Sequence, residues 1–253
     1  MYFLPAIAAS SARSCPSPSR YFRNKIQEYY SIRCVPQILG PIADALRHAA
    51  RVTEEELNSA NDNPVVIPGE GNVYHGGNFH GDYISFEMDK VKIAIGKLTV
   101  LCDRQLNFLL NQKLNRKFPP FLNAGKLGLN YGLQGLQFTA TSTTAENQAL
   151  CNSMYVHSIP SNNDNQDVVS MGTNSALFAK RVIDNAFEVM AVLLIGVAQA
   201  IDLLPLDEKE RLSPSALEMH GMIRERTTFI TEDISQAGSI QSLAHALKEK
   251  IIA

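Results

Sequence analysis

The sequence has no excess of positive charge and no long uninterrupted apolar run. Its 23 Lys and Arg residues are balanced by 25 Asp and Glu residues, which gives a net charge of -2. Without a basic stripe, a nucleic-acid partner has no electrostatic support. The longest mostly apolar stretch, Ala186 to Leu204, is interrupted by Glu188, Gln199 and Asp202. We therefore expect a core helix there and no membrane span, which needs about 18 or more apolar residues.

Cysteine is scarce, and its spacing fits neither a zinc module nor a redox motif. The chain has four cysteines, and none of them belongs to a C-x-x-C pair. They are Cys15, Cys34, Cys102 and Cys151. We expect free thiols, mostly buried, in a reducing compartment, and hence a cytoplasmic protein.

Several local motifs of common enzyme classes are also missing. The chain has no G-x-S-x-G elbow and no Rossmann fingerprint, and Gly125 to Gly128 lacks the rest of a phosphate-binding loop. His75 and His80 are five residues apart, whereas a helical zinc pair is four apart. A calcium loop starting at Asn162 would need glycine where Asp167 stands. The sequence predicts no metal site.

The first residues differ from the rest of the chain. Met1 to Ser10 is apolar, and Ser11 to Arg20 is rich in Ser and Pro. A secretory signal would begin with cationic residues, and this segment does not. We expect residues 1–23 to be a leader that is disordered or not native to the fold.

From Asn24 onward the polarity pattern is mostly helical. One stripe at spacings of three and four residues runs from Ile84 to Leu109, and a second runs from Ala176 to Ile201. Further helices are predicted over 134–151 and 41–60, and two short segments, 65–67 and 72–74, are predicted to form one small hairpin. The expected fold is all-α, an elongated bundle of long helices with functional loops.

The predicted organisation has three consecutive parts. The leader, 1–23, precedes a helical core over 24–204, and Pro205 opens a more polar helical tail over 205–253. Stripes as long as those in the core often face another subunit, so an oligomer is expected.

Polar groups concentrate in the loops between the helices, where rigid scaffolds usually carry their sites. Tyr30 and Arg33 are three residues apart, so one helical turn would point both the same way. An arginine fork can grip a carboxylate, and a tyrosine hydroxyl can transfer a proton. The amides of Asn63, Asn165 and Gln166 could orient an amino acid. From spacing alone, the preferred interpretation of Tyr30 and Arg33 is still structural, a tie between a helix start and its neighbours.

Six blocks of the sequence, in this order and at this spacing, resemble the histidine, phenylalanine and tyrosine ammonia-lyase family. They are Gln27–Gln37, Asn58–Pro64, Gly76–Gly81, Pro119–Phe121, Ala145–Asn147 and Asn165–Gly172. The resemblance covers roughly 24–204 and is closest to bacterial tyrosine ammonia-lyases. It implies a mostly helical homotetramer whose cofactor, 4-methylidene-imidazol-5-one (MIO), forms from an internal Ala-Ser-Gly triplet. That electrophile captures an aromatic amino acid, and loss of ammonia gives an arylacrylate.

The resemblance also implies roles for single residues. Tyr30 matches the family's tyrosine near the cofactor, and Arg33 matches its carboxylate-binding arginine. Positions lining the cofactor and substrate are matched by Asn63 and Phe79, and an active-site loop by Asn165 and Gln166. Core packing for Phe79 and loop bracing for Gln166 remain open alternatives.

The residue at position 166 bears on substrate selectivity. Histidine lyases resemble this loop but carry Gln-Glu-Asp, which places a carboxylate near the imidazole. Here Asn165-Gln166-Asp167 offers a neutral amide, as in phenylalanine and tyrosine lyases and in aminomutases. Glu146 falls in a matching block, but no role is implied for it.

The sequence departs from the family pattern in one respect that affects activity. Ala-Ser-Gly occurs nowhere in the chain. We therefore expect a fragment that corresponds to the C-terminal half of the family domain and is inactive by itself, because the electrophile is missing. Two alternatives stay open: a fragment of a tyrosine 2,3-aminomutase, which shares the cofactor, and a non-catalytic helical assembly remnant.

Overall fold

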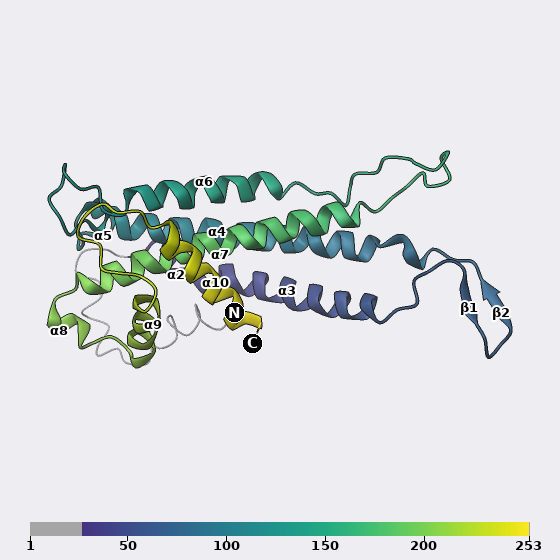
Figure 1. The fold of residues 1–253 in the computed structure, drawn as a ribbon, viewed down its shortest axis with the longest axis horizontal. Helices are drawn as coiled ribbons and strands as arrows, with labels where there is room; N and C mark the ends of the chain where they lie inside the picture. Colours follow the sequence, from purple (N-terminus) through teal and green to yellow (C-terminus); the bar gives the residue numbers. More distant parts are fainter. Residues whose placement is uncertain (1–26, 253) are drawn as a thin grey trace. The chain divides into compact units, whose positions relative to one another are not determined.

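The computed structural model of the protein describes residues 27–252. The predicted leader and Cys15 lie outside these residues. In the described part of the chain, the regular secondary structure is helical apart from one two-stranded hairpin, so the predicted all-α class is confirmed (Figure 1). Its elements are α2 (Tyr30–Arg33), α3 (Val35–Leu57), β1 (Val65–Ile67), β2 (Asn72–Tyr74), the 3-10 turn η2 (Asn78–His80), α4 (Asp82–Leu110), α5 (Gln112–Asn115), η3 (Pro120–Leu122), α6 (Gln134–Leu150), α7 (Gly172–Asp202), α8 (Leu206–Lys209), α9 (Pro214–Arg224) and α10 (Ala237–Ile252).

The chain folds into two compact units that do not follow chain order. The first comprises the described part of Met1–Leu39 together with Leu98–Ala145 and the described part of Asn185–Ala253. The second comprises Gly40–Lys97 and Glu146–Asp184. Because α3, α4, α6 and α7 each contribute residues to both, the predicted split into a core over 24–204 and a tail over 205–253 stays a prediction.

The two long apolar stripes form α4 and α7, as predicted. Their apolar residues recur at steps of three and four and thus occupy one side of each helix. α7 is long and apolar enough to cross a membrane by composition, yet 61% of its most apolar window of 18 residues is buried inside the protein. It is therefore a core helix, in agreement with the sequence-based prediction.

Helix α3 differs from its predicted bounds of 41–60. The prediction used Pro41 as a helix start, but the helix begins at Val35 and continues through Pro41. Proline removes one backbone hydrogen bond, that to the carbonyl four residues earlier. The residue there, Gln37, is exposed, so water can solvate its carbonyl. At the other end the Asn58 side chain donates to the Glu54 carbonyl and ends the helix at Leu57.

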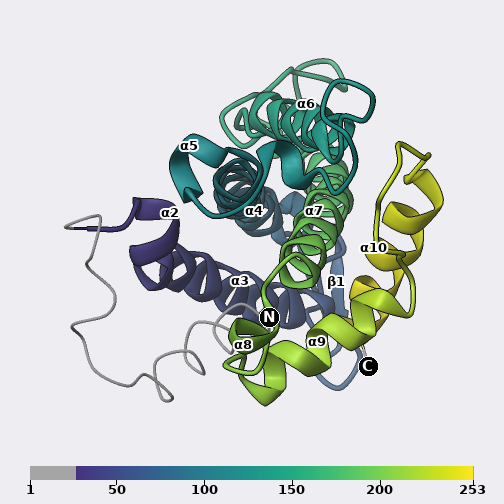
Figure 2. The same cartoon turned by 90° about the vertical axis from the view of Figure 1, so that its left-hand side faces the viewer.

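The core of the first unit lies where α4, α6 and α7 meet, and Figure 2 shows these helices side by side. Leu106 of α4 and Ile195 of α7 are almost fully buried there. Met219 and Ile223 of α9 close the same cluster. Deep burial of this many aliphatic side chains is the main stabilising contribution to the unit.

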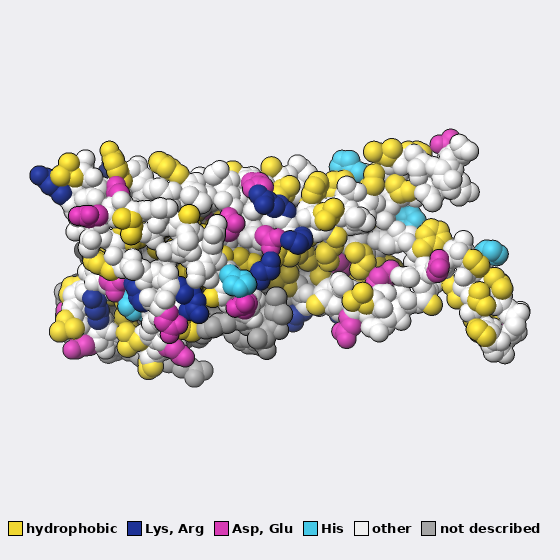
Figure 3. Space-filling model, in the orientation of Figure 1, with side chains coloured by type: hydrophobic (Ala, Val, Ile, Leu, Met, Phe, Trp, Pro, Cys, Tyr) yellow, Lys and Arg dark blue, Asp and Glu magenta, His cyan; other side chains and the backbone are white. Residues whose placement is uncertain are grey.

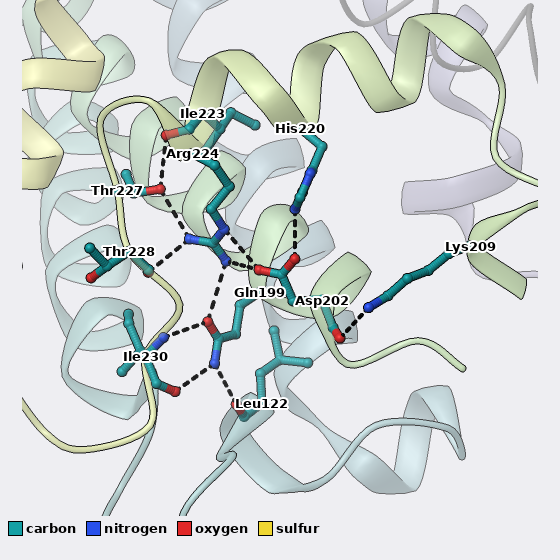
Figure 4. Close-up of polar contacts among 10 residues, drawn as sticks. All are labelled: Leu122, Gln199, Asp202, Lys209, His220, Ile223, Arg224, Thr227, Thr228 and Ile230. Carbon is teal, nitrogen blue, oxygen red and sulfur yellow. Dashed lines mark hydrogen bonds and ion pairs between the residues drawn. The ribbon is translucent and has the colours of Figure 1, made fainter. Parts of the chain in front are cut away.

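The buried side-chain amide of Gln199 joins the C-terminal segments to α7 by hydrogen bonds (Figure 4). Gln199, which is fully buried, donates to the Ile230 carbonyl over 2.8 Å, and its oxygen accepts from the Ile230 amide over 3.1 Å. One turn later, the Asp202 carboxylate accepts from His220 and Arg224 of α9, both over 2.8 Å. Both groups lie at the end of α7, so the tail is tied there by hydrogen bonds as well as by apolar contacts.

The hairpin in the second unit is confirmed with the predicted strands. β1 and β2 pair antiparallel, with Val65 opposite Tyr74 and Val66 opposite Val73. Its apolar side chains remain largely on the surface, as the space-filling view shows at the hairpin (Figure 3). The hairpin thus adds little to the core of its unit and serves to connect α3 to η2.

Candidate functional site

A cavity of about 830 Å³ opens in the second unit between two segments that are far apart in sequence. One wall is η2 with the start of α4, residues 79–81 and 84. The other wall is the loop before α7 and the first turn of that helix, residues 165–174. Three of the predicted site residues, Phe79, Asn165 and Gln166, line it together.

The loop wall owes its shape to its short polar residues. Asn162, Asn163 and Asp164 all have positive φ angles, between 52° and 61°. Asn and Asp accept this left-handed conformation more readily than other residues with a side chain. The tight turn brings Ser161 and Gln166 into an antiparallel bridge, with backbone hydrogen bonds of 3.1 and 3.3 Å.

Gln166 both braces this loop and lines the cavity. Its Oε1 accepts a 2.9 Å hydrogen bond from the Ser161 hydroxyl. The bracing role left open by the sequence is therefore present. Because only the oxygen of the amide is used by Ser161, the Nε2 atom remains as a donor on the same side chain.

The opposite wall is held in place by η2 and the glycine after it. Gly81 has a φ of +79°, a conformation that L side chains rarely adopt, and it lets the chain turn from η2 into α4. Phe79 lies two residues before it and is 53% exposed, so the described residues of this chain do not bury the ring in a core. An exposed aromatic face beside a cavity can contact a ring-bearing ligand.

Asn63 lies in the same unit but is not among the cavity-lining residues. Its Oδ1 accepts a hydrogen bond from the Gly76 amide over 3.2 Å. In the same region Asn78 donates to the Ala60 carbonyl over 3.4 Å. These two contacts join the Asn-rich segment after α3 to the glycine-rich segment before η2. Asn63 therefore positions the backbone that leads to Phe79.

Tyr30 and Arg33 belong to the first unit. They share the single turn of α2, as predicted, and the guanidinium carbon lies 4.6 Å from the centre of the Tyr30 ring. Arg33 Nε donates to the Glu28 carbonyl over 2.9 Å, and Gln105 of α4 fixes the turn through the Ser31 carbonyl. Tyr30 is 68% exposed. The pair thus presents a phenol and a guanidinium on one face.

A buried charge cluster in the second unit was missed by the sequence analysis. Lys92 is fully buried and lies 2.6 Å from the Asp89 carboxylate, one helical turn earlier on α4. The same carboxylate accepts hydrogen bonds of 2.6 Å from both Ser153 and Ser175, and one of 2.9 Å from the Tyr155 amide. It therefore joins α4 to the segment after α6 and to the first turns of α7, at both ends of the loop that carries Gln166.

The charge cluster sets the ionisation of Asp89. Burial alone would raise the pKa of this carboxyl. Hydrogen bonds from Lys92, Ser153 and Ser175 and from the Tyr155 amide outweigh burial and lower the pKa from 3.8 to about 2. Asp89 thus stays ionised at neutral pH. Glu146, whose role the sequence left open, pairs with Arg181 across 3.0 Å.

Comparison with known proteins places these observations in a family. A family model described as aromatic amino acid lyase matches residues 5–225. The tyrosine ammonia-lyase of Cupriavidus metallidurans is 42% identical over 224 residues, 88% of this chain and 42% of that protein. The tyrosine 2,3-aminomutase of Chondromyces crocatus is 41% identical over 208 residues, 82% of this chain and 39% of that protein.

Solved structures give the same result for the fold. The crystal structure of tyrosine aminomutase from Streptomyces globisporus superposes with a TM-score of 0.85 and 38% identity over 98% of this chain and 46% of that one. The chain thus spans less than half the length of each of these three relatives. The matched family model covers most of the chain, so it belongs to the aromatic amino acid lyase family.

Proposed function

We propose that this chain forms the C-terminal half of an ammonia-lyase whose whole protein releases ammonia from tyrosine, or from the related phenylalanine or histidine. The observation that carries the proposal is the cavity that unites Phe79 with Asn165 and Gln166 from the other side of the unit. Relatives named as tyrosine ammonia-lyase and tyrosine aminomutase support an aromatic amino acid as substrate.

The proposed roles rest on the family resemblance together with the chemistry of each group. The planar fork of Arg33 binds the substrate carboxylate, and the neighbouring Tyr30 hydroxyl moves a proton at the substrate's carbon atoms. Phe79 packs against the aromatic ring, with Asn165 beside it. Gln166 presents an amide nitrogen and no negative charge, so it favours a neutral ring over a cationic one.

The family cofactor cannot be formed by this chain itself. MIO derives from Ala-Ser-Gly, and the 253 residues contain no such triplet. The group supplies an electrophile when present; the residues of this chain bind and orient the substrate around it. We propose that the chain by itself does not turn over, and that the whole enzyme is a cytoplasmic homotetramer in which another segment brings the cofactor.

An aminomutase is the second candidate. The aminomutases of Chondromyces crocatus and Streptomyces globisporus are 41% and 42% identical to this chain, against 42% for the lyase. Both reactions start from the same substrate, so the site residues alone do not separate them. The products do: a lyase releases an arylacrylate, whereas an aminomutase returns a β-amino acid.

The test is an assay of the enzyme reconstituted from this chain and a separately expressed N-terminal segment that carries the family's Ala-Ser-Gly triplet. Tyrosine, phenylalanine and histidine are supplied, arylacrylate is followed by ultraviolet absorbance, and β-amino acids are sought by chromatography. We expect arylacrylate from tyrosine, and no product from this chain alone. If the reconstituted enzyme assembles but turns over none of the three amino acids, the proposal is replaced by the alternative that the chain is a non-catalytic helical assembly remnant.

Variants at two positions assign the roles within that assay. Arg33→Ala should raise KM for tyrosine by about 100-fold, because a charged hydrogen-bonding partner of the carboxylate is lost. Arg33→Lys, which keeps the charge but not the fork, should recover part of this loss. Gln166→Glu should move the preference toward histidine by about tenfold. An unchanged KM in Arg33→Ala would contradict carboxylate binding by this residue.

A further inference from the structure

His80 connects the two walls of the cavity directly. Its Nε2 lies 3.0 Å from the backbone carbonyl oxygen of Val168, although the two residues are 88 positions apart. A carbonyl oxygen can only accept, so this nitrogen carries the proton and donates. The other ring nitrogen, Nδ1, faces the Asp82 carboxylate at 3.5 Å. The imidazole therefore lies between a carboxylate on its own wall and a carbonyl on the opposite wall.

A second tie joins the same two segments further in. The Ser85 hydroxyl donates to the Ser170 carbonyl over 2.5 Å, and Ser85 is fully buried. The acceptors of the two ties, the carbonyls of Val168 and Ser170, are two residues apart. The loop wall is thus fastened to the other wall at two neighbouring points.

The two ties differ in depth. Ser85 lies in the interior, where its carbonyl oxygen is 2.9 Å from the Ser175 hydroxyl oxygen. The His80 side chain is 36% exposed and follows Phe79 directly. On the loop side, only Asp167 separates Val168 from Gln166. In sequence, the outer tie is therefore adjacent to Phe79 on one wall and two residues from Gln166 on the other.

We propose that His80 is a positioning residue: its bond to Val168 holds the loop so that Gln166 lies opposite Phe79 at the spacing an aromatic substrate requires. The selectivity part of this proposal rests on the proposed function, whereas the tie itself does not. His80 acts through Gln166 and does not itself contact the substrate.

Hydrogen exchange of the whole chain tests the tie without any assay of activity. Three amides report on the loop: Asn165, Gln166 and Val169 donate to loop acceptors at Asn162, Ser161 and Ser158. In His80→Ala, we expect these amides to exchange about tenfold faster, the effect of losing one hydrogen bond. Exchange in α4 and α7 should not change.

Two further variants make the result specific. His80→Gln replaces the ring donor by an amide N–H and should restore slow exchange in the loop. His75→Ala removes the same kind of side chain five residues earlier, at a position that does not line the cavity, and should leave the loop unchanged. Unchanged loop exchange in His80→Ala, or equal acceleration in His75→Ala, would overturn the tie.

The kinetic readout separates this inference from the proposed function. In the reconstituted enzyme, His80→Ala should raise KM for tyrosine about tenfold with kcat within about twofold, and His80→Gln should recover KM. If wild-type enzyme turns over and KM is unchanged while loop exchange is faster, the positioning role is wrong. If wild-type enzyme is inactive, the proposed function fails, and the exchange data alone decide whether His80 holds the loop.

Discussion

Replacing Lys92 by methionine tests whether the buried charge cluster holds the second unit together. Methionine keeps most of the length and apolar surface of lysine but removes its charge. Lys92 is fully buried, and it contacts the Asp89 carboxylate at 2.6 Å and the Asn152 carbonyl at 2.9 Å. The variant therefore leaves a buried carboxylate without its cation while changing the packing little.

The expected cost is about 3 kcal/mol of unfolding free energy, at the low end for removing one partner of a buried pair. It falls at the low end because Ser153, Ser175 and the Tyr155 amide still donate to Asp89. The ionisation of Asp89 gives a similar scale: lowering its pKa from 3.8 to about 2 corresponds to about 2.5 kcal/mol.

The direction in which the unfolding free energy changes with pH can also be checked. The folded-state pKa of Asp89 is depressed, so its contribution to stability is complete above the unfolded value of 3.8 and is lost as pH falls toward about 2. Lys92→Met removes one of the hydrogen bonds that lower the pKa of Asp89, while burial still raises it. The folded-state pKa of Asp89 is therefore higher in the variant than in the wild type. The loss of stability as pH falls below 3.8 should then be smaller in the variant than in the wild type, because the folded-state pKa of Asp89 lies closer to its unfolded value.

Urea unfolding followed by circular dichroism, repeated from pH 7 down to about pH 3, measures both effects. Lys97→Met serves as the matched control, because Lys97 is exposed on the same helix. The control should unfold within about 0.5 kcal/mol of the wild type. A cost below about 1 kcal/mol for Lys92→Met, together with the same loss of stability on acidification as in the wild type, would refute the reasoning.

Three further predictions concern packing and burial elsewhere in the chain. Gly96→Ala should cost about 1–3 kcal/mol, because the added Cβ would overlap Cys151 Sγ, and Cys151→Ala in the same background should recover most of this in urea titrations. Burial raises the pKa of Cys102 to about 12, so at pH 8 a thiol reagent should label this residue only after denaturant is added, and labelling of the native chain would show the burial to be wrong. Gln199→Leu leaves the buried amide and carbonyl of Ile230 without their partner; it should cost about 2–3 kcal/mol and open residues 225–236 to proteolysis, and resistance equal to the wild type would count against this tie.

The long helices could be predicted because their pattern is local. α6 was predicted over 134–151 and spans Gln134–Leu150, and α7 ends at Asp202, before Pro205, as expected. Turn chemistry likewise predicted the hairpin. The start of α3 could not be predicted from Pro41, since a proline is tolerated inside a helix when the carbonyl it leaves unpaired faces water.

The polar side of α4 was not predicted, because only apolar residues were used to find stripes. Ser85, Asp89, Lys92, Gly96 and Thr99 recur at steps of four and three, and all five are buried. The spacing was therefore visible in the sequence, but burial of a lysine is rare unless a partner is at hand. The partners are Asn152 and the serines on other segments, whose proximity only the tertiary structure provides.

The site required non-local information in the same way. Nothing in the spacing of Phe79 and Gln166 indicates that they line one cavity; the family resemblance pointed to both, and the second unit brings them together. Asn63 accepts a hydrogen bond from the Gly76 amide and is not among the residues that line this cavity, so the substrate-binding role implied by the resemblance stays a prediction.

The contact between Ser161 and Gln166 bears on how one loop can serve different aromatic rings. Ser161 donates to Oε1, an atom that glutamine and glutamate share. A glutamate at position 166 would keep this hydrogen bond, so the turn need not refold. What changes is the second atom of the group, a donor nitrogen in the amide and an acceptor oxygen in the carboxylate. The scaffold thus separates the shape of the loop from the charge it presents, and a change in ring preference can come from one side chain.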